Sequence, residues 1–377
     1  MDARKYSLLA AALMAGGIGA ANAETSVTLY GLVDAGLVYQ RGKVGTSDSA
    51  RPEYGRSYHS RVGFGANQQS GSRWGLRGVE DLGDGLRAVF VLESGFSVSD
   101  GNSDNGGRLF GRQATIGLEH DEFGRVDLGR QQNVASEFLA GVDPFDLDFL
   151  QANLGTTFSA ANTVRYDNSV LYHTPVWGGF QAAAGYSFNF DSHQTDDFRR
   201  KRNSRAVTAG LRYASGPLEA VLTYDQQFLY PKQPQPKQAI VGLAYDMEVV
   251  KISAAYGWTK DGVLSGQGIE LVGGGGNTNT PANGLGGTNG AFTWKGLRIN
   301  SYMLGLSAPI GSGKVLASYQ RADPNKGLDA TDVYSLGYVH DLSKRTNLYA
   351  FASYANRAAF VDGNKMTTVG VGVRHRF

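Results

Sequence analysis

Segments in which apolar and polar residues alternate follow one another along almost the whole chain of 377 residues. Successive side chains of a β-strand point to opposite sides, so each such segment predicts a strand with one apolar and one polar face. Beyond the N-terminal stretch, no apolar run approaches the roughly 20 residues of a membrane-spanning helix. The alternating segments number about 16 and are 27–39, 72–80, 86–96, 109–120, 126–130, 164–174, 180–190, 207–213, 218–224, 239–245, 250–258, 298–308, 314–321, 332–341, 346–354 and 367–377.

The connections between these segments are alternately short and long. Short connections carry the Gly, Asp, Ser and Pro residues of tight turns and lie at 83–85, 121–124, 177–179, 215–217, 246–248, 311–313 and 342–344. Longer polar connections lie near 41–71, 97–108, 131–163, 191–204, 229–237, 259–297, 322–331 and 356–366. This order predicts an all-β, antiparallel up-and-down meander whose two ends emerge on the same side.

The two faces of the predicted strands differ in charge. The apolar faces carry no charge and end in aromatic residues, as in Leu222 and Tyr224, whereas Arg73 and Arg77 alternate with Trp74 on the opposite face. A soluble β-sandwich also alternates, but aromatic girdles around an apolar band are typical of a barrel in lipid. We therefore predict a transmembrane barrel of about 16 strands, wide enough for a channel. We interpret the many glycines of the polar face as positions where the lumen has no core to fill.

The N-terminus predicts export. A short basic stretch is followed by an apolar stretch and by the small residues Ala21-Asn22-Ala23, which is the pattern of a cleaved signal peptide over residues 1–23. The alternative, a membrane anchor, requires a longer apolar run. The barrel domain is then expected over residues 24–377, in the bacterial outer membrane. The formal net charge of +2 gives no reason to expect a nucleic-acid partner, and the absence of cysteine excludes disulfides.

Several stretches resemble one known family. They are "SVTLYGLVDAGL" (26–37), "GSRWGLRGVEDLGDGLRAVFVLESGF" (71–96), "LFGRQATIGLEHDEFGRVDLGRQ" (109–131), "VRYDNSVLYHTPVWGGF" (164–180) and the final "VGVRHRF". Together they are similar to the general porins of Gram-negative outer membranes, of the trimeric 16-strand type of beta-proteobacteria. The resemblance implies a homotrimer with a water-filled channel for passive diffusion of ions and small hydrophilic solutes. It also implies a third long connection folded inward as a constriction, and a terminal Phe377 read by the barrel-insertion machinery.

The third long connection, residues 131–163, is unusually apolar for a loop in water. Its large apolar residues are Phe138, Leu139, Phe145, Leu147, Phe149, Leu150, Leu154 and Phe158. It also carries four acidic residues and no basic residue, for a net charge of −4, and the acids are Glu137, Asp143, Asp146 and Asp148. Long loops of this content are usually packed and functional. Packing against the inner barrel wall buries the aromatic rings and leaves the acids in water.

A basic wall is expected to face this acidic loop. The candidates on the polar faces are Arg73, Arg77, Arg87, Arg112, Arg130 and Arg165. The resemblance singles out the arginines of "SRWG", "FGRQA" and "VRYDN", which are Arg73, Arg112 and Arg165. Arg112 has the parity of the outer face, so it requires a bulge or a position beyond the apolar band. Opposed charges across a narrow gap give a transverse field that selects solutes, unless these arginines only pair with lumen carboxylates. The arginines favour anions and the loop acids favour cations.

Other function classes are less well supported by the residues. An enzyme in a barrel needs a nucleophile or paired carboxylates in fixed geometry, but the six histidines fall in separate segments, outside G-x-S-x-G or H-E-x-x-H. Residues 143–148 lack the glycine and terminal glutamate of a calcium loop. No cofactor is therefore expected. A substrate-specific channel, or an adhesive barrel acting through its outer loops, stays open. A basic stretch that could bind anions or lipopolysaccharide comprises Arg199, Arg200, Lys201, Arg202 and Arg205.

Overall fold

The computed structural model describes residues 26–43, 58–190, 203–231, 233–264 and 292–377. The predicted signal peptide (residues 1–23) and residues 199–202 of the basic stretch lie outside the described residues. The strand elements are β1 (Ser26–Lys43), β2 (Tyr58–Ala66), β3 (Arg73–Gly83), β4 (Leu86–Gly95), β5 (Gln113–His120), β6 (Gly124–Gln132), β7 (Arg165–His173), β8 (Phe180–Ser187), β9 (Arg205–Ser215), β10 (Leu218–Phe228), β11 (Lys237–Asp246), β12 (Lys251–Val263), β13 (Phe292–Ile310), β14 (Gly313–Pro324), β15 (Thr331–Asp341), β16 (Thr346–Asn356) and β17 (Lys365–Arg376).

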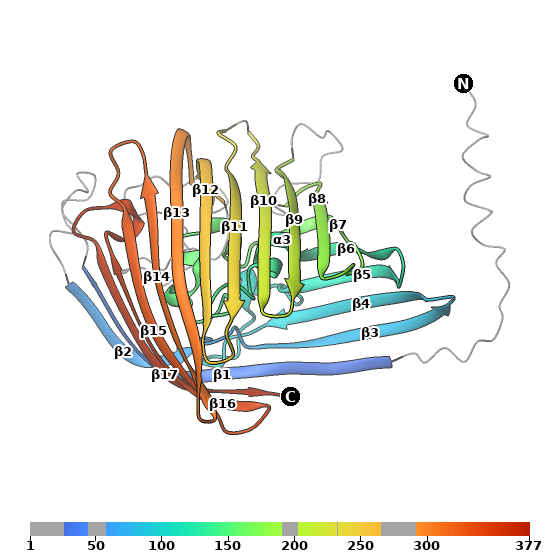
Figure 1. The fold of residues 1–377 in the computed structure, drawn as a ribbon, viewed down its shortest axis with the longest axis horizontal. Helices are drawn as coiled ribbons and strands as arrows, with labels where there is room; N and C mark the ends of the chain where they lie inside the picture. The colour runs from blue at the N-terminus through green and yellow to red at the C-terminus, as the bar shows by residue number, and fades with distance from the viewer. Residues whose placement is uncertain (1–25, 44–57, 191–202, 232, 265–291) are drawn as a thin grey trace.

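These elements form one closed antiparallel barrel. From β3 onward each strand pairs with its neighbour in the chain, and β1 closes the ring by pairing with β17. One half of β1 pairs with β2 and the other half with β3, so β2 and β3 lie end to end as one interrupted strand. The 17 elements of the described residues therefore make 17 − 1 = 16 barrel strands, as the alternation predicted. Figure 1 shows β16 and β17 beside β1, with the C-terminus at this seam.

Three strand boundaries differ from the predicted ones in ways that matter for the prediction. β2 lies inside the predicted connection 41–71 and was not predicted as a strand. Its outer face has only two large apolar residues, Val62 and Phe64, before the pattern is interrupted. β5 begins at Gln113 and not at residue 109. β13 begins at Phe292, inside the predicted connection 259–297, because strand pairing continues beyond the part with a clear apolar alternation.

The two faces of the barrel wall are arranged as the alternation predicted. On β10, Leu222 is 48 % exposed on the outside, whereas its neighbour Thr223 is 1 % exposed on the inside. Aromatic rings gather at both ends of the outer face. Phe180 and Tyr213 lie 4.5 Å apart near the tight turns, and Tyr319 and Tyr334 lie 5.1 Å apart toward the long connections. Rings that gather at both ends of an apolar band form the girdles of a barrel in lipid.

In the described residues, helical structure is limited to short turns in the long connections. These elements are α2 (Asp104–Gly107), α3 (Val134–Phe138), η2 (Leu150–Ala152), η3 (Leu154–Thr156), η4 (Ser159–Ala161) and η7 (Ala358–Phe360). Within the described part of the chain, no helix has the length and apolar character needed to cross a membrane. The largest buried apolar cluster lies inside the barrel, around α3 and the residues that follow it.

Candidate pore constriction

The connection between β6 and β7, residues 131–163, lies within the ring of strands (Figure 1) and is named here the constriction loop. Its first turn, α3, is capped by Asn133, whose side-chain oxygen accepts a hydrogen bond from the backbone N–H of Ser136 at 3.2 Å. The same amide donates to the Asp225 carboxylate of β10 at 2.8 Å. An N-cap of this kind satisfies a backbone donor that has no partner within the helix. Here it also fixes the start of the loop to the inner wall.

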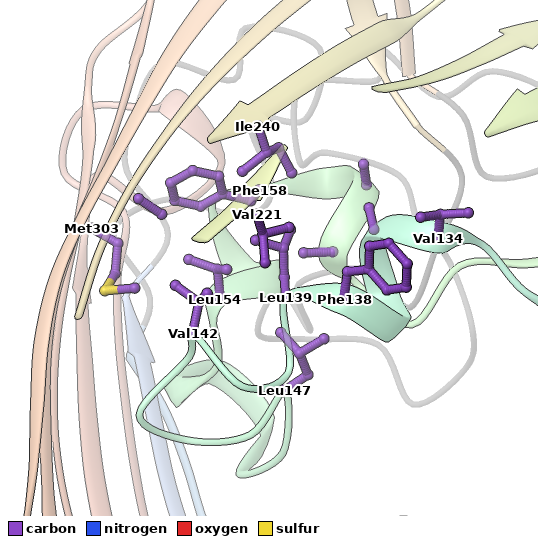
Figure 2. Close-up of a cluster of buried hydrophobic side chains, with 14 of the residues drawn as sticks. Val134, Phe138, Leu139, Val142, Leu147, Leu154, Phe158, Val221, Ile240 and Met303 are labelled. Carbon is purple, nitrogen blue, oxygen red and sulfur yellow. The ribbon is translucent and has the colours of Figure 1, made fainter. Parts of the chain in front are cut away.

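Apolar side chains hold the loop against the strands. Figure 2 shows Leu139, Leu154 and Phe158 of the loop packed beside Ile240 of β11 and Met303 of β13. A second cluster further along the loop joins Phe145 and Phe149 to wall residues of β14, β15 and β16. The Phe149 ring lies 5.8 Å from Tyr349 and 5.6 Å from Phe351 in edge-on contacts. Burial of these apolar side chains favours the position of the loop against the wall over a position in water.

Glycines of the wall make room for these side chains. A Cβ atom at Gly257 would lie 2.8 Å from the Phe158 ring, and one at Gly242 would lie 3.0 Å from Leu139. The wall glycines that face the loop in this way are Gly210, Gly242, Gly257, Gly305 and Gly337, on β9, β11, β12, β13 and β15. The interpretation of lumen glycines as positions without a core to fill is therefore wrong for these five. The loop side chains pack against the wall at these glycines.

Buried glutamines of the wall satisfy the backbone of the loop. The Gln238 side chain accepts a hydrogen bond from the Ala160 N–H at 2.8 Å. The Gln320 side chain donates to the carbonyls of Ala152 and Asn153, both at 3.0 Å. A loop buried without such partners would leave its peptide groups unpaired at a cost in free energy. The polar wall therefore selects one position for the loop.

The four loop acids do not form one continuous acidic face. Asp143 is 3 % exposed, and its carboxylate accepts hydrogen bonds from the backbone N–H groups of Phe145, Leu147 and Leu154 at 2.8–3.1 Å. Burial raises its pKa to about 7, against the opposite effect of these three donors. Asp143 thus holds the fold of the loop and does not face the lumen, contrary to the expected placement of the acids in water.

The other three acids contact polar or basic partners on the wall. Glu137 lies 3.0 Å from His173 Nε2 of β7, and Asp146 lies 3.3 Å from Lys314 Nζ of β14.

Asp148 marks the tip of the loop. It accepts a hydrogen bond from Ser70 Oγ at 2.6 Å and lies 3.6 Å from the Arg374 guanidinium. Burial raises the pKa of Asp148 to about 6, while the Ser70 hydroxyl, Arg73 and Arg374 act in the opposite direction.

Three predicted arginines gather around one glutamate. Arg112 donates to the Glu93 carboxylate of β4 at 2.6 Å, and Arg165 donates to the backbone carbonyl of Arg112 at 3.0 Å. Arg73 stands at the start of β3 opposite Gly95, over which the Arg112 side chain runs. Arg73 and Asp148 are close enough to interact electrostatically. Arg73, Arg112 and Arg165, named here the arginine cluster, therefore lie beside the tip of the constriction loop.

Arg112 reaches this cluster because it is not part of a strand. β5 begins one residue later, and the Arg112 N–H donates to the Glu93 carbonyl at 3.1 Å. Of the two predicted explanations, a bulge or a position beyond the apolar band, the bulge is therefore unnecessary, because the outward parity ends with the strand. Glu93 was not among the predicted site residues, although its lumen parity in the alternating segment 86–96 was a usable signal.

The other arginines of the predicted wall have partners of their own, and one of them, Arg130, is close enough to Arg165 of the cluster to interact electrostatically. Arg130 sits at a bulge of β6, donates to the Gly111 carbonyl at 2.7 Å, and contacts Asp167 at 2.5 Å. Arg77 is exposed, with its guanidinium 5.6 Å from the Tyr30 ring.

Arg87 pairs with Glu119 and Asp121 at 2.8 and 2.7 Å, which is the pairing that the sequence left open. It lines a cavity of about 690 Å³ on the lumen side of β4–β8, together with polar residues that include Gln113, Glu119, Arg125 and His173.

Comparison with known proteins agrees with this architecture. A family model described as Gram-negative porin matches residues 9–359. The chain belongs to the family of Gram-negative porins. An outer membrane porin protein of Bordetella pertussis is 50 % identical over 392 residues, covering 99 % of this chain and 100 % of the relative. Outer membrane porin protein 32 of Delftia acidovorans is 35 % identical over 396 residues, with the same coverage.

A solved structure has the same fold. A porin from Comamonas acidovorans, described as anion-selective, superimposes with a TM-score of 0.70 at 30 % identity, covering 94 % of this chain and 100 % of that one. This porin is therefore an outer-membrane β-barrel that forms a passive channel, and it is not an enzyme.

Two sets of residues that shape the porin's constriction were not predicted. The wall glutamines Gln238 and Gln320 were not singled out, because sequence alone does not say which lumen residues a loop covers. Of the segment between β2 and β3, residues 67–71 were assigned to an outer connection and residue 72 to the following strand, although Ser70 contacts Asp148. Its polar "NQQSGS" between two alternating stretches was the available signal.

Proposed function

We propose that this porin is a channel with a preference for anions, whose aperture lies between the arginine cluster and the tip of the constriction loop. An imbalance of charge carries the proposal. Four arginines near the loop tip (Arg73, Arg112, Arg165 and Arg374) face two carboxylates that are not fully buried (Glu93 and Asp148), which leaves 4 − 2 = +2. Asp34, which also interacts with Arg374, is 0 % exposed and accepts hydrogen bonds from backbone N–H groups within the wall. The remaining acids of the constriction loop contact His173, Lys314 or the loop's own backbone.

The mechanism is electrostatic and passive. A small anion that enters from the long connections meets guanidinium N–H groups that replace part of its hydration shell. The barrel wall has a low dielectric constant, which focuses the field of the surplus arginines into the lumen. Cations pass against this field at a lower rate. The process requires no bound cofactor and no source of energy, and large or apolar solutes are excluded by width and by ordered water.

The predicted arginines that lie outside the cluster have other roles in this proposal. Arg77 is exposed on β3, two residues further along the polar face than Gly75, and extends the positive path away from the aperture. Arg130 holds the bulge of β6 to Asp167 of β7. The printed description of the Comamonas acidovorans porin as anion-selective, at 30 % identity over 94 % of this chain, supports the same direction of selectivity.

Assembly belongs to the same proposal. We infer a homotrimer in contact with outer-membrane lipid and lipopolysaccharide, formed after removal of residues 1–23 and after recognition of Phe377 by the barrel-insertion machinery. The uncharged outer faces, with exposed residues such as Leu222 and Tyr256, support burial in lipid or in a subunit interface. An unboiled sample on a denaturing gel should migrate as a trimer and a boiled sample as the 40.3 kDa chain or its processed form.

The deciding measurement is the reversal potential of single channels under a KCl gradient in a planar bilayer. We expect the sign of an anion-preferring pore, and we expect Arg73→Gln to lower the chloride to potassium permeability ratio. One charge at about 8 Å in water changes the energy of chloride by roughly 0.5 kcal/mol and that of potassium by the same amount in the opposite direction, so the ratio should fall by about sixfold.

A matched control is Arg345→Gln, which removes the same charge from the exposed tight turn between β15 and β16 and should leave the ratio nearly unchanged. A cation sign for the unmodified protein would contradict the proposal, as would equal effects of the two variants.

A further inference from the structure

The interruption between β2 and β3 brings a short segment of the wall into contact with the constriction loop. β2 ends at Ala66, β3 begins at Arg73, and the residues between them make no strand pairs with β1. Asn67 opens this segment with a φ of 59° and donates its backbone N–H to the Asp34 carbonyl at 3.1 Å. Its side-chain oxygen accepts from the Ser72 N–H at 2.8 Å, which closes residues 67–72 into a compact turn.

A single buried carboxylate organises this turn. Asp34 of β1 is 0 % exposed and accepts hydrogen bonds from three successive backbone N–H groups, those of Gln68, Gln69 and Ser70, at 3.1, 3.0 and 2.9 Å. The Tyr349 hydroxyl of β16 adds a fourth hydrogen bond at 2.7 Å. Hydrogen bonds to an ionised acceptor are roughly twice as strong as neutral ones. Asp34 therefore fixes both the conformation and the position of the turn.

The turn contacts the tip of the constriction loop at two adjacent points. The Gln69 carbonyl accepts a hydrogen bond from the Phe149 N–H at 2.9 Å. The Ser70 hydroxyl donates to Asp148 at 2.6 Å and accepts from Arg374 of β17 at 2.7 Å. Backbone and side chain of the tip are thus both held from the wall opposite to the loop's first turn, where Asn133 is bound to Asp225.

The tip needs such an external restraint because its backbone is strained. Four of the five residues 146–150 have a left-handed backbone, with φ of 54° at Asp146, 56° at Leu147, 65° at Phe149 and 51° at Leu150. Side chains with a Cβ rarely adopt this conformation, and it persists only where surrounding contacts impose it. The Gln69 carbonyl contacts one of these strained residues, Phe149, from outside the loop, and Ser70 contacts Asp148, which lies between Leu147 and Phe149.

We propose that residues 67–72, fixed by Asp34, are a clasp that holds the tip of the constriction loop across the lumen and thereby positions Asp148 in the aperture. The role in selectivity rests on the proposed function, because it assumes that the aperture lies at this tip. The role in positioning does not. Gln69, Ser70 and Asp34 are positioning residues in this scheme: none of them needs to touch a passing ion.

The test is a reporter on the tip that does not depend on ion flow. The chain has no cysteine, so Leu150→Cys, at a side chain that is 38 % exposed on the tip, gives one site for a spin label. In the purified barrel the label should be immobilised. Adding Ser70→Ala or Asp34→Asn should convert it to a mobile spectrum.

The matched control is Ser318→Ala, which removes a hydroxyl from a serine on the wall that is 8 % exposed and for which the structure gives no hydrogen-bond partner. It should leave the label immobile.

A label that stays immobile in Ser70→Ala, in a barrel that still shifts on heating before electrophoresis, would overturn the clasp. If Asp34→Asn fails to fold, Ser70→Ala alone decides. Reversal potentials of the same variants separate the two proposals. A mobile tip with an anion-preferring wild type supports both, whereas a mobile tip with a cation-preferring wild type retains the clasp and removes the selectivity assignment.

Discussion

At the scale of single residues, the hydrogen-bond partners and the exposure of each ionisable side chain decide its role in this lumen. Asp143 and Asp148 lie five residues apart on one loop, yet one binds backbone N–H groups and the other faces Ser70 and Arg374. A carboxylate surrounded by its own backbone contributes to folding, whereas a partly exposed one contributes to the field in the aperture. The count of acids in a loop is therefore a poor guide to its field.

Asp148 should make the selectivity depend on pH. Burial raises the pKa of Asp148 to about 6, so the side chain is mostly charged at pH 7.5 and mostly neutral at pH 5. Loss of this negative charge increases the surplus of arginines near the tip from +2 to +3. Reversal potentials measured at the two pH values should show a stronger anion preference at pH 5.

The variant Asp148→Asn isolates this group from Asp143, whose pKa burial raises to about 7. It should show at pH 7.5 the anion preference that the unmodified channel reaches at pH 5, and it should respond little to pH. Glu122→Gln, in the exposed turn between β5 and β6, provides a control with the same loss of charge. If the reversal potential of Asp148→Asn changed between pH 7.5 and pH 5 as much as that of the unmodified channel, another group would be responsible for the pH dependence.

At the scale of elements, the constriction loop and the wall are complementary in shape. Phe158 fits against Gly257, and Leu139 with Val142 fits against Gly242. Close packing of this kind leaves no space for an additional methyl group unless the loop moves. The position of the loop, and with it the width of the lumen, is thus encoded in the small residues of the wall.

Gly257→Ala should narrow the channel. The new methyl group would lie 2.8 Å from the Phe158 ring, so the loop must shift toward the lumen or lose packing worth about 1–3 kcal/mol. We expect a lower single-channel conductance or a noisier open state. Gly63→Ala on β2 is the control, because a Cβ there meets nothing within 4 Å. Equal conductance in Gly257→Ala and Gly63→Ala would show that the loop's position does not depend on this contact.

The elements were predictable to the extent that they follow a local period. Strands β9–β17 all contain the alternation from which they were predicted, and the tight turns at 83–85 and 311–313 lie where their glycines placed them. β2 was missed because its pairing with β1 depends on a distant strand and hardly on its own apolar face. The clustering of Arg73, Arg112 and Arg165 rested on a resemblance. Their partner Glu93 and the contact of Ser70 with Asp148, 78 residues apart, follow only from the folded barrel.

At the scale of the whole molecule, the seam between the two ends of the chain completes the barrel. β1 and β17 are in register from Leu32 opposite Arg376 to Lys43 opposite Lys365. Beyond this register, the Phe377 N–H donates to the Gly31 carbonyl at 3.0 Å, and the Gly31 N–H donates to the Phe377 carbonyl at 3.1 Å. A closed ring has no free strand edge to pair with another chain. The last residue therefore contributes to closure by its backbone and separately carries an exposed ring.

These two contributions of Phe377 should be separable. Phe377→Ala keeps both hydrogen bonds to Gly31, whereas deletion of the residue removes them at a cost of about 1–3 kcal/mol. We expect purified Phe377→Ala to refold in detergent with nearly the urea midpoint of the unmodified porin, and the deletion variant to unfold at a lower concentration. In cells, the proposed recognition of the aromatic side chain by the insertion machinery predicts that both variants reach the outer membrane in reduced amounts. Normal amounts of Phe377→Ala in the outer membrane would restrict the role of this residue to closing the barrel.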